Sequence, residues 1–193
     1  MKSENEILEL VLQDRILADL LREVCEFDLT RGDYCEHVRV SSGAALKVVA
    51  GDFTGGRFFL CGEPRSIRPV LYASSEGQAG LIGRSLAEAL QFMVGLPSWW
   101  DCLKFSGDGD VVTMNLAAEH LQRDELTDRP GITARRSQLA TALSLDLETV
   151  PVLVTRLRDV VVGTTPDFVF TDETGEYESL FGPWHPSRNP SWT

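Results

Sequence analysis

The sequence lacks the features of membrane-spanning and secreted proteins. No apolar run approaches the ~20 residues that cross a bilayer, and the opening MKSENEILEL has neither the basic nor the apolar region of a signal peptide. Basic residues are few, with 18 Lys and Arg against 29 Asp and Glu, so the net charge is -11. Because such a surface repels phosphate, nucleic acid is an unsuitable partner. We expect a cytoplasmic protein that binds neither nucleic acid nor membranes.

Cysteine and histidine are also scarce, at four and three residues, and no CxxC pair occurs. Cys25, Cys35 and His37 are three loosely spaced candidates for zinc, and nothing in the sequence places Cys61 near them as a fourth. A structural zinc site needs four ligands at short, paired spacings. We therefore predict no metal and no cofactor, and expect the cysteines to be buried thiols rather than disulfides in the cytosol.

A catalytic serine signature is missing as well. Ser75 lies in ASSEG, but a nucleophile elbow needs G-x-S-x-G with the helix starting at the serine. Here the helix cap, Ser85, comes ten residues later. We interpret this stretch as a scaffold corner in which Gly77 and Gly80 supply positive φ angles. None of the histidines stands beside a nucleophile in a recognisable pattern, so we predict no catalytic residues.

Helix and strand signals are well developed. Capping boxes, S-x-x-E, begin apolar-periodic helices after Ser3 and after Ser85. Three short apolar runs between turn residues predict an antiparallel meander. The expected helices cover 4–24, 85–97 and segments starting near 110, 133 and 149, and the expected strands are AALKVVAG, RFFLCG and PVLYAS. SWWDCLKF is either a short helix or an extended link, and residues 167–181 form a hairpin with DETG as its turn.

These elements predict an α+β fold, a mostly antiparallel sheet flanked by helices, with additional C-terminal helices and a terminal hairpin. We expect one domain over residues 1–193, with a core at about 44–97, a helical elaboration at about 108–162 and a hairpin and tail at about 167–193. Asp108 and Asp110 suggest a calcium loop, but the further acidic ligands are missing. Asp110 is better explained as a helix N-cap.

Two features suit a protein partner. Trp99 and Trp100 are adjacent and cannot both face inward on a regular helix or strand, so either one is exposed for a partner or both pack at a corner. The hairpin carries a run of carboxylates without a basic residue among them, including Asp172, Glu173, Glu176 and Glu178. Those charges either protect a sheet edge or attract a basic partner.

Within residues 44–97, a strand leads into a turn with Asp52, Gly55 and Gly56, further strands follow, and Ser85 precedes a helix. This arrangement resembles the central region of the SUKH superfamily. In that family a strand leads into an Asp-x-x-Gly-Gly turn, and further strands and a Ser-capped helix follow. The matching residues here are Asp52, Gly55, Gly56, Phe59, Pro69, Val70, Ser85 and Leu86. The usual N-terminal signature is not evident, and nothing after Trp99 aligns.

The resemblance implies a curved, mostly antiparallel sheet with packed helices, and no catalytic motif. It also implies an immunity protein that neutralises a toxin, often a nuclease, or an interaction scaffold. We therefore expect a non-enzymatic protein-binding domain whose partner is a basic nuclease-type toxin. Two alternatives stay open: a regulatory or structural scaffold that forms homo-oligomers, and a hydrolase-type enzyme whose cysteine or histidine residues converge in space.

Overall fold

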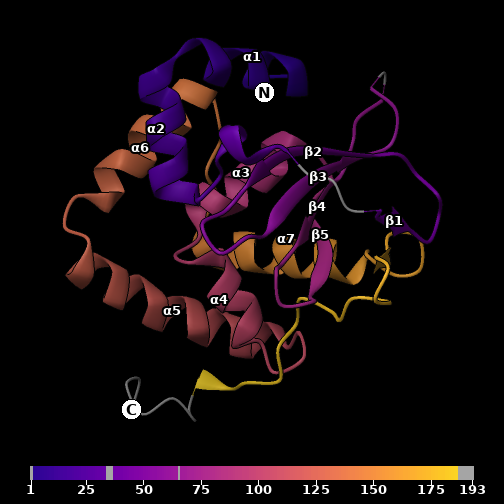
Figure 1. The fold of residues 1–193 in the computed structure, drawn as a ribbon. Coiled ribbons are helices and arrows are strands. Elements are labelled where there is room, and N and C mark those ends of the chain that lie inside the picture. Colours follow the sequence, from indigo (N-terminus) through magenta and orange to yellow (C-terminus); the bar gives the residue numbers. More distant parts are fainter. Residues whose placement is uncertain (1, 34–36, 65, 187–193) are drawn as a thin grey trace.

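The computed structural model describes residues 2–33, 37–64 and 66–186. In these residues seven α-helices pack with a four-stranded antiparallel sheet and a separate two-stranded sheet (Figure 1). This confirms the predicted α+β class. Within the same residues, no helix has both the length and the apolar character needed to cross a membrane.

The elements follow the chain in a simple order. The helices are α1 (Glu4–Gln13), α2 (Arg15–Cys25), α3 (Leu86–Gly95), α4 (Trp99–Lys104), α5 (Val111–Asp128), α6 (Ile132–Leu143) and α7 (Val150–Val162), with a 3-10 turn η1 (Leu29–Arg31). The strands are β1 (Arg39–Val40), β2 (Leu46–Gly51), β3 (Arg57–Cys61), β4 (Val70–Ala73), β5 (Ala79–Gly83) and β6 (Phe170–Thr171). The three predicted C-terminal helices are confirmed, and SWWDCLKF contains the short helix α4.

The single N-terminal helix that we predicted is wrong, because Asp14 divides it in two. The residue ends α1 in an extended conformation, and its Oδ1 accepts hydrogen bonds from the N–H groups of Ile16 and Leu17 at the start of α2. At the corner between the two helices, Leu12 and Ile16 are 73% and 75% exposed. The capping box of Ser3 and Glu6 is confirmed.

The central sheet has the order β2-β3-β4-β5, with every neighbouring pair antiparallel. The three predicted strands are present, but the expected glycine-rich corner contains a fourth one, β5. Gly77 has the positive φ of 88° in the preceding turn, whereas Gly80 lies within β5 and was wrongly assigned such an angle. Gly80 is needed for space, because a Cβ there would meet Thr164 and Leu180 at 3.0–3.1 Å.

Both faces of the sheet carry aromatic packing. Phe58 pairs with Tyr72 across β3 and β4, and the ring of Phe27 lies 4.9 Å from that of Phe58. The next residue, Phe59, points to the other face, where its ring is 5.3 Å from Phe170. Strands β3, β4 and β5 are therefore buried almost throughout.

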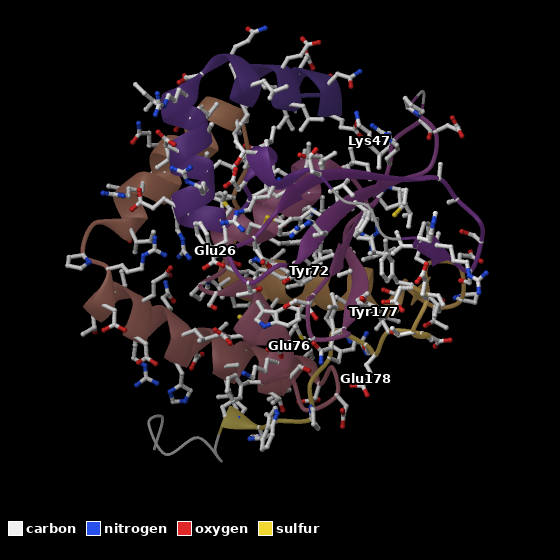
Figure 2. All side chains as sticks on the ribbon, viewed as in Figure 1. Glu26, Lys47, Tyr72, Glu76, Tyr177 and Glu178 are labelled. Carbon is white, nitrogen blue, oxygen red and sulfur yellow. The ribbon has the colours of Figure 1, made fainter. Side chains whose placement is uncertain are left out.

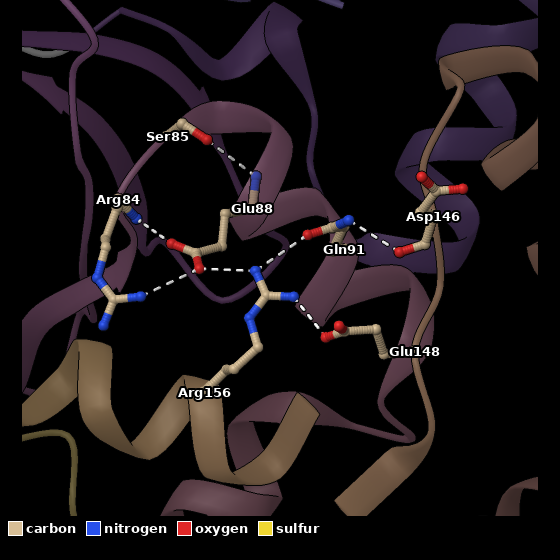
Figure 3. A network of polar contacts seen from close by, with 7 residues as sticks. All are labelled: Arg84, Ser85, Glu88, Gln91, Asp146, Glu148 and Arg156. Carbon is tan, nitrogen blue, oxygen red and sulfur yellow. Dashed lines mark hydrogen bonds and ion pairs between the residues drawn. The ribbon is translucent and has the colours of Figure 1, made fainter. Parts of the chain in front are cut away.

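Helix α3 is the central helix, buried from Leu86 to Val94. Ser85 caps it as predicted, with its Oγ accepting from the Glu88 N–H at 3.2 Å. The second half of the capping box is different, because the Glu88 carboxylate accepts from the N–H of Arg84 rather than from that of Ser85. The same carboxylate pairs with Arg156 of α7 at 2.7 Å, which ties the two helices together (Figure 3).

The C-terminal turn is confirmed and joins both sheets. Thr171 bridges Glu176 around the DETG turn, and β6 pairs with β1. Beyond the turn, Glu178 forms a parallel bridge to Gln78 at the start of β5. This segment therefore runs beside the turn that precedes β5, and in Figure 2 Glu178 lies close to Glu76 of that turn.

Candidate functional site

A cavity of about 320 Å³ lies where one end of the sheet meets the C-terminus of α2 and the helices α4, α5 and α6. Its size is near the lower end for small-molecule sites, which occupy ~300–1,000 Å³. Glu26 and Tyr72, which line it from α2 and the sheet, are labelled in Figure 2. The remaining lining residues that matter for its chemistry are Asp52, Ser75, Glu76, Trp99, Trp100, Asp101, Lys104, Glu125, Arg129 and Arg136.

Aromatic rings form one wall. The Tyr72 ring lies 5.3 Å from Trp99 and 5.2 Å from Trp100, both edge to face. The two indoles are 5.8 Å apart at 78°. Trp99 is buried, with 9% exposed, whereas Trp100 is half-buried. The two indoles thus have different environments, since Trp99 packs in the core and Trp100 lines the cavity without being fully exposed.

Asp52 fixes the sheet side of the cavity. Its Oδ1 accepts from the Thr54 N–H, the Thr54 hydroxyl and the Gly56 N–H, each at 2.8 Å, which closes the turn between β2 and β3. Its Oδ2 accepts from the Tyr72 hydroxyl at 2.5 Å. A Cβ at Gly56 would collide with both side chains of that bond. The second glycine of the Asp-x-x-Gly-Gly turn therefore leaves the space in which the buried hydrogen bond between Asp52 and Tyr72 forms.

Tyr72 stays a donor in this arrangement. Burial, followed by the hydrogen bond and charge of Asp52, raises the pKa of Tyr72 far above its usual value. The phenol is therefore protonated at every physiological pH and holds the Asp52 carboxylate in place.

Glu26 has an unusual backbone. It caps the C-terminus of α2 in the left-handed region, at φ 54° and ψ 27°, where glycine or asparagine is the usual residue. Partial burial, reinforced by the charges of Asp52 and Asp101, raises the pKa of Glu26. Glu26 accepts no hydrogen bond from the described residues, although the charge of Arg129 acts on it and lowers its pKa in part.

Two arginines of the cavity share a single carboxylate, that of Glu125. Arg136 lies 2.8 Å from a Glu125 carboxylate oxygen and donates to the Leu96 carbonyl at 3.0 Å. Arg129 lies 3.8 Å from Glu125 and donates to the Glu23 carbonyl at 2.9 Å. The lining as a whole holds five carboxylates against one lysine and two arginines, and this excess of two negative charges favours a cation.

The cavity carboxylates that open toward this space come from Glu26, Asp52, Glu76 and Asp101, and the lysine is Lys104. The Ser98 hydroxyl donates to Asp101 at 2.5 Å. Among residues 2–33, 37–64 and 66–186, no three or more His, Cys, Asp or Glu side chains are placed to hold a metal ion.

The predicted acidic residues lie outside this cavity, and one of them, Glu178, lies beside the turn at its rim. Glu178 pairs through its backbone N–H with the Gly77 carbonyl at 2.8 Å, beside the turn that carries Ser75 and Glu76. Glu173, Glu176 and Glu178 are exposed. Asp172 differs, since its carboxylate accepts from Thr174, Gly175 and Tyr177, and these bonds lower its pKa. Asp172 thus builds the turn that presents the others.

The remaining candidates have structural positions. Burial raises the pKa of Cys25 strongly and that of Cys61 and Cys102 to about 12. These thiols stay protonated near neutral pH and are weak nucleophiles. Cys35, a predicted zinc candidate, lies outside the described residues. Asp110 is the N-cap of α5, accepting from the Thr113 N–H at 2.8 Å, so the cap interpretation is confirmed.

Sequence reasoning did not find Glu26, Asp52 and Tyr72 as site residues. Glu26 had a signal, because a charged residue follows the last periodic position of a helix where a C-cap is expected. Asp52 and Tyr72 are 20 residues apart, and no sequence pattern predicted their hydrogen bond. Scans of the chain against models of protein families, against curated proteins and against solved structures found no match.

Proposed function

We propose that the protein is a non-enzymatic domain that binds a basic protein partner in the cytoplasm. The observation that carries this proposal is the cavity itself, where a half-buried indole lies among carboxylates that outnumber the basic side chains. Aromatic side chains in a partly desolvated pocket supply most of the energy at protein interfaces. Surrounding charges of one sign speed association with a partner of the opposite sign.

The charge distribution supports a partner over a small substrate. Glu76 lies on the cavity rim, and Glu178 lies beside it on the segment that follows the C-terminal turn. Both carboxylates add negative charge at the edge of the cavity, in a chain of net charge -11. A non-enzymatic role is further supported by the three buried cysteines, whose raised pKa values make them poor nucleophiles.

The resemblance of residues 44–97 to SUKH proteins makes a toxin the partner that we favour, with this chain as its immunity protein. The turn closed by Asp52 and Gly56 carries both the resemblance and one wall of the cavity. The surface that binds the toxin would then be built around the same turn that shapes the fold.

A homo-oligomerising scaffold is the second candidate. Leu12 and Ile16 project from the corner between α1 and α2 with 73% and 75% of their surfaces exposed. Paired apolar side chains of this kind are suited to a contact between copies of one chain. This alternative predicts that the protein self-associates and that Leu12→Ser or Ile16→Ser abolishes self-association.

Affinity capture from the native host tests the main proposal. The wild-type chain, Trp100→Ala and Trp184→Ala are used as baits, and recovered proteins are then purified and re-bound in isolation. Trp184 is the matched control, since it is 55% exposed and lies outside the cavity. We expect the wild type and Trp184→Ala to bind one basic protein, and Trp100→Ala to lose it. Equal binding by all three baits, or a purified partner of acidic charge, would overturn the proposal.

A further inference from the structure

We propose that the cavity binds the guanidinium group of an arginine that the partner presents. This inference rests on the proposed function, because it names the group by which a basic partner would be recognised. Two parts of the cavity lining support this inference. One is the aromatic wall formed by Tyr72, Trp99 and Trp100, and the other is the carboxylate of Glu26.

The acceptors in the cavity differ in what they already hold. Asp52 accepts four hydrogen bonds from Thr54, Gly56 and Tyr72. Asp101 accepts one from the Ser98 hydroxyl. Neither Glu26 nor Glu76 accepts a side-chain hydrogen bond from the described residues. Of these two, Glu26 is the carboxylate whose pKa is raised, by burial and by the charges of Asp52 and Asp101, so it is the better placed to receive a donor from a ligand. A carboxylate that faces other carboxylates gains most from a cation, because the ligand also relieves their mutual repulsion.

A guanidinium group fits this lining better than the other cations. It is planar and weakly hydrated, stacks on indole and phenol rings, and donates in a fork that matches a carboxylate. An ammonium group is a compact, strongly hydrated charge that uses an aromatic wall less well. A metal ion would need converging ligands, which the described residues do not supply. An anion would meet arginines already paired with Glu125.

The backbone at two cavity positions is consistent with a retained function. Glu26 and Ser98 both have left-handed conformations, at φ 54° and φ 42°, although neither is glycine. Both line the cavity. Such conformations lower stability and persist where the surrounding structure or a function holds them. Substituting Glu26 is therefore expected to weaken binding without unfolding the protein.

Binding of a small probe tests the inference without the partner. N-butylguanidinium is titrated into the wild-type chain, and the backbone and indole N–H resonances are followed by NMR. N-butylurea, a neutral analogue of the same shape, and butylammonium are titrated in parallel. For a ligand of this size we expect a dissociation constant on the order of 1 mM for N-butylguanidinium, at least about tenfold weaker binding of butylammonium, and no saturable binding of N-butylurea.

Variants then locate the site. Glu26→Gln is expected to weaken N-butylguanidinium binding about tenfold, since it removes one charge-assisted contact. Trp100→Ala is expected to weaken it by a similar factor. Glu9→Gln is the matched control, because it removes the same charge from the exposed face of α1. Equal shifts with N-butylurea, equally tight butylammonium, or an unchanged affinity in Glu26→Gln would each overturn the guanidinium assignment.

The two proposals fail in different ways. If affinity capture yields a basic partner that requires Trp100 but N-butylguanidinium does not bind, the guanidinium assignment is wrong and the binding function stands. If N-butylguanidinium binds with the expected dependence on Glu26 but no basic protein requires the cavity, the proposed function is wrong. Loss of a captured partner on replacing its arginines with lysine, one at a time, would extend the result to the protein complex.

Discussion

At the scale of single residues, Glu26 is the position where chemistry and stability conflict. It occupies a left-handed helix cap, beside other carboxylates, and has no hydrogen-bond donor among the described residues. Ordinary selection for stability would favour glycine or asparagine there. Functional residues often have shifted pKa values, and they often lower the stability of the folded protein.

We expect Glu26→Gln to stabilise the protein at pH 7. The pKa of Glu26 is raised in the folded state by partial burial and by Asp52 and Asp101, so folding disfavours the ionised form. The resulting loss of stability is present above the folded-state pKa and disappears as the pH falls below the unfolded value of about 4.3. The gain should be no more than ~0.5 kcal/mol, because solvent screens an exposed group.

Urea unfolding of the wild type, Glu26→Gln and Glu9→Gln at pH 7 and pH 4 measures this effect. The advantage of Glu26→Gln should shrink between the two conditions, whereas Glu9→Gln should show no such pattern. A Glu26→Gln variant that is less stable at pH 7 would mean that the carboxylate supports the fold.

At the scale of elements, local caps explain where most helices begin, and one cap explains a boundary that periodicity alone missed. Ser3, Ser85 and Asp110 each accept from the backbone N–H three residues later. Asp14 does so inside an apolar run that reads as continuous helix. Its side chain satisfies two N–H groups at the start of α2 and so allows the chain to turn there.

Replacing Asp14 with alanine should lower the free energy of unfolding by about 1 kcal/mol, because two N–H groups of α2 lose their acceptor. Asp19→Ala is the control, since Asp19 is exposed and only pairs with Arg22 within α2. That surface pair is worth no more than ~0.5 kcal/mol. The measurement is urea denaturation of both variants. Equal losses would show that the Asp14 cap contributes nothing beyond its charge.

Strand β5 shows the limit of local reasoning about elements. Its sequence, AGLIG, contains two glycines and reads as a turn. It becomes a strand because β4 pairs with it on one side and helices α3 and α7 pack on it. The close approach of Thr164 and Leu180 leaves no space for a side chain at Gly80.

At the scale of the whole molecule, the segment after the C-terminal turn lies beside the cavity rim, because Glu178 pairs with Gly77 next to Glu76. Because Asp172 holds that turn together, neutralising it would alter the structure as well as the charge. The better variant replaces Glu173, Glu176 and Glu178 with glutamine and leaves Asp172 intact.

We expect this triple variant to associate more slowly with the basic partner, and its dissociation rate to change less, because exposed charges at the edge of an interface steer rather than anchor. Added salt should slow the wild type more than the variant, since exposed charges are screened beyond ~8 Å at physiological ionic strength. Stopped-flow association at two salt concentrations measures both effects. The control replaces Glu9, Glu63 and Asp128, and equal rates in the two triple variants would remove this turn from the interface.

The sequence by itself determined the α+β class, most helix starts, the first three strands of the meander and the DETG turn. All of these depend on side chains within a few residues of one another, where caps, periodicity and turn residues act. It also drew attention to Trp99 and Trp100 through their adjacency alone. Only the tertiary structure decided that Glu26, Asp52 and Trp100 line one cavity. They come from a helix end, a sheet turn and a short helix far apart in the chain, and packing of the core around α3 brings these segments together, which no local pattern encodes.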